Sequence, residues 1–246
     1  MTAPADRHRV IAVTRRALVL AGLAAAAVGC KDRTAQVVEQ LERPAGGCVL
    51  DRAETLELDW EKPDGCGAED AQCRDACLAG DAASCLARAF SVQKLTDREE
   101  ESTLLFLRAC ERGLAIACTN YAAALWASST SEPSQACAAR LFEATCAVKE
   151  PFGCGMSGRM ILDAAEGPDE IARGRSVLER GCKEAGGFAC RALALHLESG
   201  ELGPVDPKRI VELLARACET GDEDACGTHA KAADTFTPPA GDAGAK

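Results

Sequence analysis

Cysteines are the residues of this sequence that could do chemistry, because they are frequent and regularly spaced. The chain has 15 cysteines in 246 residues, and five of them are followed by a second cysteine eight positions later. The pairs are Cys77 and Cys85, Cys110 and Cys118, Cys146 and Cys154, Cys182 and Cys190, and Cys218 and Cys226. The first members of successive pairs lie 33, 36, 36 and 36 residues apart, which indicates an internal repeat. A thiol pair at such a spacing could form a disulfide, bind a metal ion or act as a redox couple.

A metal site would need more ligands than these pairs supply. A structural zinc ion takes four Cys or His ligands, often from two closely spaced pairs. Beyond residue 29 the sequence has only two histidines, His196 and His229, and it has no Cys-x-x-Cys motif. The Cys-x-x-Cys-His motif of attached haem is therefore absent as well. The sequence predicts no metal site and no cofactor.

The N-terminus has the pattern of an export signal. Four arginines precede an apolar run over residues 17–28, which is too short to span a membrane but has the length found in signal peptides. Arg15 and Arg16 also fit a twin-arginine signal, so the export route stays open. Export to an oxidising compartment makes disulfides the expected state of the later cysteines.

The end of this signal, Ala27-Val28-Gly29-Cys30, resembles the lipobox of bacterial lipoproteins. The resemblance implies cleavage after Gly29, acylation of Cys30 and, through Lys31, retention at the outer membrane. An ordinary cleaved signal followed by a chance cysteine is the alternative. We therefore expect a lipid-anchored protein of the bacterial cell envelope, at the outer membrane and facing the periplasm or the cell surface.

The charge of the chain excludes one class of partner. Residues 1–29 contain four arginines and one aspartate, so their removal would leave a net charge of −13. Such a surface repels phosphate backbones, because it has no excess of Lys or Arg to release counterions. We expect no binding to nucleic acid, and we expect membrane attachment to come from the lipid rather than from a basic patch.

The eight-residue spacing requires elements that bring each pair of cysteines together. Residues 208–218 have apolar side chains at helical spacing and end at the first cysteine of the last pair. Asp206 and Pro207 have the types expected of an N-cap and a first helical residue. Residues 96–99 predict a capping box at the start of the second unit, and residues 167–170 open the fourth unit in a similar way.

A glycine follows the first cysteine by three positions in three units, as Gly80, Gly113 and Gly221. In the left-handed conformation it would end the helix and turn the chain back into an antiparallel partner. The second cysteine would then lie in the first turn of that partner, where small neighbours allow the close approach that a disulfide needs. One such bond stabilises the fold by about 2.5 kcal/mol on the chain-entropy model.

The recurring pattern, Ala-Cys-x-x-Gly followed by Ala-Cys-x-x-Leu-Ala with residues 200–208 joining two units, resembles the Sel1-like repeat, a relative of the tetratricopeptide repeat. More narrowly, it is similar to cysteine-rich Sel1-type proteins, in which a disulfide at this spacing bridges each helix pair. The resemblance implies an all-α fold, an α/α superhelical solenoid of about five disulfide-bridged Sel1-like helix pairs over residues 69–232. Lys149, Pro151 and residues 185–187 depart from the pattern and leave the turns of the third and fourth units open.

The chain outside the repeats is less regular. We expect a signal peptide over residues 1–29, a tether and irregular N-terminal cap over 30–68, and a disordered tail over 233–246. Four further cysteines remain, namely Cys48, Cys66, Cys73 and Cys137. They allow three pairings, and since Cys137 looks distant from the others, their pairing stays open.

The cysteine-rich Sel1-type family includes members described as weak β-lactamase or penicillin-binding proteins, so a hydrolase is the enzymatic alternative. Ser91 and Lys94 match the Ser-x-x-Lys element of such enzymes, but the Ser-Asp-Asn and Lys-Thr-Gly elements are missing. A solvated polar turn near the end of a helix is the favoured interpretation of this match.

Four other residues have side chains of the types found in sites. We interpret His196, in an apolar helical stretch, as structural, and His229 as solvated or interacting with a helix end. Tyr121 and Trp126 are interpreted as packing between repeats. We therefore predict no catalytic residue.

The predicted function is that of an envelope-anchored protein-protein interaction scaffold. Stacked helix pairs present an extended concave face that binds a protein or peptide ligand without chemistry. The alternatives are the weak β-lactamase-like hydrolase and a purely structural envelope protein.

Overall fold

The computed structural model describes residues 47–51, 53–59 and 61–228. The predicted signal peptide, the lipidation candidate Cys30, His229 and the predicted tail lie outside these residues.

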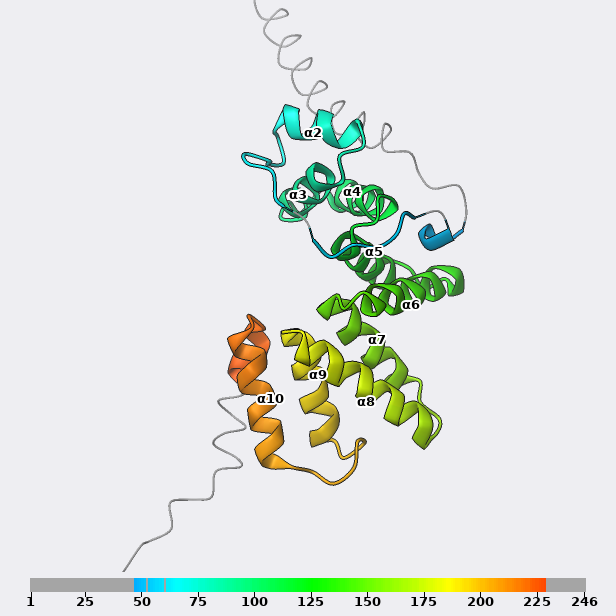
Figure 1. The fold of residues 1–246 in the computed structure, drawn as a ribbon, viewed down its shortest axis with the longest axis vertical. Coiled ribbons are helices and arrows are strands. Elements are labelled where there is room, and N and C mark those ends of the chain that lie inside the picture. Colours follow the sequence, from blue (N-terminus) through cyan, green and yellow to red (C-terminus); the bar gives the residue numbers. More distant parts are fainter. Residues whose placement is uncertain (1–46, 52, 60, 229–246) are drawn as a thin grey trace, which may run out of the picture. The chain divides into compact units, whose positions relative to one another are not determined.

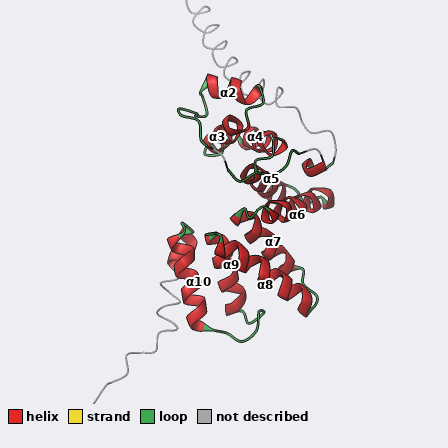
Figure 2. Cartoon of the chain, in the orientation of Figure 1, coloured by secondary structure: helices red, strands yellow, loops and turns green. Residues whose placement is uncertain are grey.

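The described part of the chain is helical (Figure 1, Figure 2). A short 3₁₀ helix, η1 (Val49–Asp51), precedes α2 (Ala71–Leu78), α3 (Ala82–Val92), α4 (Glu99–Glu111), α5 (Ala115–Ser128), α6 (Glu132–Ala147), α7 (Pro151–Asp163), α8 (Pro168–Lys183), α9 (Gly187–Glu198) and α10 (Pro207–Glu219). Residues 223–228 are helical as well. Extended pairing within the described residues is limited to an isolated parallel bridge between Glu57 and Leu114.

The helices pack in the order in which they occur in the chain. Each helix from α2 to α9 contacts the next one, and α7 also contacts α9. Such nearest-neighbour packing defines a repeat solenoid, in which each helix pair buries its apolar side against the adjoining pair. The predicted all-α solenoid of about five disulfide-bridged helix pairs is confirmed.

A disulfide joins the two helices of each pair at one end. Every cysteine of the eight-residue spacing is bonded to its partner in that spacing: Cys77 to Cys85, Cys110 to Cys118, Cys146 to Cys154, Cys182 to Cys190, and Cys218 to Cys226. The Cα atoms of these five bonded pairs are 4.4–4.7 Å apart.

The position of each cysteine in its helix explains the spacing. The first cysteine is the second-to-last residue of α2, α4, α6, α8 and α10, and the second lies four residues after the N-cap of the partner helix. The eight-residue spacing is thus the length of a helix end, a turn and a helix start.

The same turn closes the first helix in all five units. The amide four positions after the first cysteine donates to the carbonyl oxygen of the residue before that cysteine, at 3.0–3.2 Å. The residue three positions after the cysteine has a positive φ in every unit, with Gly80, Gly113 and Gly221 in three of them. Lys149 and Ala185 take this place in the other two, at φ values of 68° and 65°. The turn is therefore kept where glycine is missing.

Glycine at these two places is expected to stabilise the protein. Lys149 and Ala185 are exposed, so Lys149→Gly and Ala185→Gly remove a strained left-handed conformation without removing buried contacts. Each change should raise the free energy of unfolding by about 0.5–1 kcal/mol. Relief of the backbone strain stabilises the folded state, and the greater freedom of glycine in the unfolded chain partly offsets that gain. Urea denaturation followed by circular dichroism measures the change.

The matched control is Gly221→Ala, where an added Cβ would meet no atom within 4 Å. The added methyl group causes no steric contact, and the backbone strain it introduces outweighs the reduced freedom of the unfolded chain, so the variant should be about 1 kcal/mol less stable. Equal stability of all three variants and the wild type would contradict this explanation.

The predicted helix starts are confirmed at two of three places. Asp206 caps α10, its carboxylate accepting from the amide of Arg209 at 3.1 Å, and α8 starts at Pro168. The capping box at residues 96–99 is wrong, because α4 begins at Glu99 with Arg98 as its N-cap.

Glu101, in the first turn of α4, forms a buried ion cluster. Its side chain is 1% exposed and accepts hydrogen bonds from Arg88 of α3 at 2.9 Å and from Arg98 at 2.7 Å. The bond between Arg98 and Glu101 is the main cause that raises the pKa of Arg98 above its ordinary value. A charged, three-residue cluster thus joins the first and second units.

The four remaining cysteines form two disulfides, Cys48–Cys137 and Cys66–Cys73. The expectation that Cys137 lies far from the others is therefore wrong for Cys48, which is 89 residues away in sequence. The two meet because the chain around η1 contacts both α4 and α6. This bond links the start of the described chain to the third unit.

Main-chain hydrogen bonds hold the rest of this N-terminal stretch to the second unit. The amide of Glu57 donates to the carbonyl of Gly113 at 2.7 Å, and its carbonyl accepts from the amide of Ala115 at 2.9 Å. A Cβ at Gly113 would lie 2.4 Å from the carbonyl oxygen of Thr55. Glycine is thus required at this turn for a second reason, the close approach of another backbone.

Candidate functional site

Ser91 lies in α3 with its hydroxyl bound to main-chain oxygens. Its Oγ is 3.0 Å from the carbonyl oxygen of Ala87 and 3.4 Å from that of Cys66, and Lys94 is exposed beyond the helix end. A hydroxyl that donates to carbonyl oxygens is oriented away from the role of a lysine-activated nucleophile. The geometry therefore gives Ser91 a structural role.

Tyr121 and Trp126, both of α5, have different environments. Tyr121 is buried, whereas Trp126 is 39% exposed. A ligand cage would need both rings to line one accessible space, so these two residues do not supply one.

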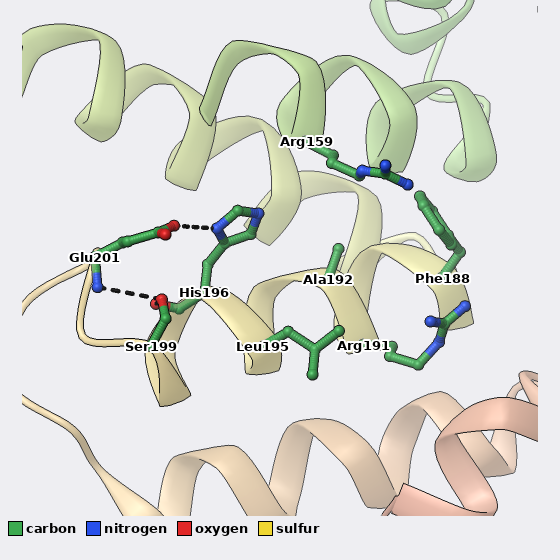
Figure 3. A pocket seen from close by; sticks show the side chains of 8 residues that line it. All are labelled: Arg159, Phe188, Arg191, Ala192, Leu195, His196, Ser199 and Glu201. Carbon is green, nitrogen blue, oxygen red and sulfur yellow. Dashed lines mark hydrogen bonds and ion pairs between the residues drawn. The ribbon is translucent and has the colours of Figure 1, made fainter. Parts of the chain in front are cut away.

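His196 lies at the edge of a pocket. Its side chain is 16% exposed, and its Nδ1 is 2.6 Å from Oε2 of Glu201, a residue that follows α9. The apolar stretch around it predicts a structural histidine, and the ring is partly buried and pairs with Glu201 at the pocket wall (Figure 3).

The pocket has a volume of about 320 Å³ and is formed mainly by one face of α9. Its lining residues are Arg159, Phe188, Arg191, Ala192, Leu195, His196, Ser199 and Glu201. The α9 members recur at intervals of three and four residues, which places them on one side of the helix. Arg159 comes from α7 (Figure 3). The second helices of the third and fourth units therefore create this pocket together.

Arg191 is fixed by the unit that follows. Its Nε lies 2.9 Å from both carboxylate oxygens of Asp222, and its Nη2 is 3.4 Å from Asp224. Its guanidinium also lies over the ring of Phe188, 5.4 Å from the centroid. The cation-π contact and the charged hydrogen bond, in which Nε is shared between the two oxygens of Asp222, hold the guanidinium in one orientation. The pocket thus depends on the fifth unit as well.

A polar pair at the positions of Arg191 and Asp222 is also found at another junction between units. Arg191 directly follows the second cysteine of its unit, and Asp222 is at the N-cap position of the next unit's second helix, where it accepts from the amide of Ala225 at 3.0 Å. Thr119 and Glu150 occupy the same two places at the junction between the second and third units and share a 2.6 Å hydrogen bond. Polar pairs of different chemistry therefore join different units.

At the junction between the third and fourth units, glycine takes the place of these polar side chains. A Cβ at Gly155, which follows the second cysteine of its unit, would lie 2.6 Å from the ring of Phe188. A Cβ at Gly158 would lie 2.9 Å from the backbone nitrogen of Leu178. Glycine thus lets α7 approach both α8 and the start of α9, which brings Phe188 next to the α7 side of the pocket.

Sequence reasoning singled out His196 but missed the other pocket residues. The periodic signal at residues 188, 191, 192, 195 and 196 was available and shows one helix face. Arg159 carries no such signal, because its place at the pocket follows only from the packing of α7 on α9.

Within the part of the chain that the structure describes, no group of three or more His, Cys, Asp or Glu residues lies close enough to hold a metal ion. In the same residues, no helix combines the length and apolar character needed to cross a membrane.

The fold and the site together define a helical repeat protein whose helix pairs are linked by disulfides and whose adjacent units share a surface pocket. Scanning the chain against models of protein families gave no match, and no curated protein matches it either. Among solved structures it is similar to the crystal structure of c5321, a protective antigen of uropathogenic Escherichia coli strains that displays an SLR fold. The sequences are 16% identical with a TM-score of 0.48, and the match covers 67% of this chain and 36% of that chain.

Proposed function

We propose that this protein is an envelope-anchored scaffold for protein-protein interaction. The observation that carries the proposal is the pocket between α7 and α9, which two successive units build together and which offers apolar, basic and acidic side chains to solvent. Repeat solenoids bind their partners through such surfaces, including their concave faces, because each added unit extends the accessible area. A peptide or a protein segment is the expected ligand.

The proposed location depends on the N-terminal sequence. An apolar run of signal-peptide length followed by a lipobox-like end supports acylation of Cys30 and attachment to the outer membrane, facing the periplasm or the cell surface. The seven disulfides among the described residues support a protein that works in an oxidising compartment. Resemblance to the cysteine-rich Sel1-type repeat, whose helix pairs are bridged by disulfides, agrees with the second point.

Site-specific crosslinking in the intact bacterial envelope tests the scaffold function. A photoreactive amino acid replaces Leu195, which lines the pocket and is 43% exposed. We expect it to capture a reproducible protein partner, identified by mass spectrometry. The control places the same amino acid at Leu95, an exposed leucine near the end of α3, where it should capture this partner at least ten times less efficiently.

Two outcomes would contradict the proposal. If neither position yields a protein adduct, the scaffold function fails, and a structural role is favoured. If the Cys30→Ala variant still sediments with membranes and the wild-type protein incorporates no labelled fatty acid, the lipid anchor fails while the binding function stands.

A further inference from the structure

We propose that the pocket between α7 and α9 binds an acidic, apolar peptide segment of the partner protein, in which a carboxylate lies next to a branched apolar side chain. This inference rests on the proposed scaffold function and names the chemistry that its ligand must have. The partner is a protein segment rather than a small anion, because the pocket offers charged and apolar contacts side by side.

Two guanidinium groups form the part of the pocket that would hold the carboxylate. Figure 3 shows the side chain of Phe188 between the guanidinium groups of Arg159 and Arg191. The hydrogen bonds of Nε to Asp222 orient the side chain of Arg191. They do not use its two terminal nitrogens, Nη1 and Nη2. A guanidinium that is already oriented loses less conformational freedom when it binds a carboxylate.

The remaining partners of these two arginines are weak and replaceable. Arg159 is 3.4 Å from Asp163 in an exposed pair on the same helix, with side chains 48% and 56% exposed. Nη2 of Arg191 is 3.4 Å from Asp224, whose side chain is 82% exposed. Exposed ion pairs of this kind contribute little to stability. A carboxylate entering the pocket can therefore replace Asp163 and Asp224 at small cost.

The apolar part of the pocket adjoins these arginines on the same helix face. Phe188, Ala192 and Leu195 line it, and Leu195 exposes 43% of its surface to solvent. An apolar side chain beside the ligand's carboxylate would cover Leu195 and remove that surface from water. A ligand with charge alone would leave this half of the pocket unfilled.

Charge complementarity favours an acidic ligand at this place. The whole chain has a net charge of −10, so most of its surface repels acidic segments. The pocket lining differs, because its charged residues are two arginines, Arg159 and Arg191, and one glutamate, Glu201. Complementary charge of this kind selects the partner and its orientation.

Fluorescence anisotropy with defined peptides tests the inference. The probe is fluorescein-labelled Gly-Leu-Glu-Leu-Glu-Leu-Gly, and the control probes replace both glutamates by glutamine or all leucines by serine. The wild-type protein should bind the first probe at least tenfold more tightly than either control. Binding should weaken as the salt concentration rises, because part of it is electrostatic.

Variants of the protein separate the pocket from general charge effects. Arg159→Gln and Leu195→Ser should each weaken binding at least fivefold. Arg173→Gln should leave it unchanged, because Arg173 is an arginine of α8 that is exposed, ion-paired with Glu143 and outside the pocket lining. Circular dichroism verifies that all three variants keep their helical content.

Equal binding of the acidic and glutamine probes, or no effect of Arg159→Gln, would overturn the inference. So would an absence of binding to every probe. If crosslinking at Leu195 still captured a partner in the envelope, the scaffold function would survive that result, and only the ligand chemistry assigned here would be lost.

Discussion

Replacing Cys48 and Cys137 together by alanine is expected to lower the free energy of unfolding by about 4 kcal/mol, since this disulfide closes the longest loop in the described chain. The bond joins residues 89 positions apart, so its loss frees a large number of conformations in the unfolded state. Urea denaturation under non-oxidising, non-reducing conditions, followed by circular dichroism, measures the change.

The matched control is the double variant Cys66→Ala and Cys73→Ala. These cysteines are as buried as Cys48 and Cys137, but their disulfide spans only seven positions. The chain-entropy model therefore assigns this variant a loss of about 2.5 kcal/mol. Equal losses in the two variants would show that loop length does not determine the effect.

Hydrogen exchange offers a second readout of the same prediction. The amides of Glu57 and Ala115 form the hydrogen bonds that hold the N-terminal stretch on the α4–α5 turn. Without Cys48–Cys137 this stretch loses its covalent link, while its main-chain bonds, the buried side chain of Val49 and exposed ion pairs such as that between Arg140 and Asp51 remain. Both amides should exchange faster in that variant, whereas the Cys66 and Cys73 variant should retain their protection.

Glu101→Gln is expected to destabilise the protein by about 3–5 kcal/mol, because it leaves a buried arginine without its counter-charge. Arg88 is 4% exposed in its side chain, and its Nε has no hydrogen-bond partner in the structure. Among the residues that the structure describes, Glu101 is the one ion-pair partner of Arg88 and compensates its charge. Urea denaturation again provides the measurement.

Two further variants show whether the buried charge is the cause. Glu212→Gln removes a carboxylate that is 52% exposed and paired with Lys208 and Arg209, so it should change stability by less than about 1 kcal/mol. Adding Arg88→Met to Glu101→Gln removes the unpaired charge and should recover part of the loss. If the double variant were less stable than Glu101→Gln alone, burial of an unpaired charge would not explain the effect.

The repeat and its turn could be predicted because their determinants are local. The eight-residue cysteine spacing, the glycine three positions later and the N-cap at Asp206 all act within one helix end and its turn. Lys149 and Ala185 depart from the glycine pattern, yet both take up the positive φ that glycine takes elsewhere. The disulfide and the neighbouring hydrogen bonds are the same in all five units, and together they hold the backbone of these two residues in that conformation.

The capping box at residues 96–99 failed for a nonlocal reason. A glutamate in the first turn of a helix normally reaches back to the N-cap amide. Here the helix begins two residues later than the box predicts, so Glu99 is the first helical residue and Glu101 takes the third position. Glu101 binds two guanidinium groups instead of the N-cap amide, one of them from the preceding helix α3. A charged hydrogen bond in a buried place is stronger than the local cap, and nothing in the local sequence indicates that Arg88 will be there.

The amino-acid sequence was enough to predict the class of fold and the turn that each cysteine pair closes, since the turn depends on residues within about ten positions of one another. The repeat length was also predictable, because the cysteine pairs recur at nearly constant intervals. The tertiary structure was needed to show that Cys48 bonds to Cys137, that Glu101 pairs with Arg88, and that Arg159 of α7 lines the same pocket as Phe188 and Arg191 of α9. Each of these arrangements brings together side chains from different parts of the chain. Their distances follow from how closely helices pack, which at the α7–α8 junction depends on glycines that bring the backbones together.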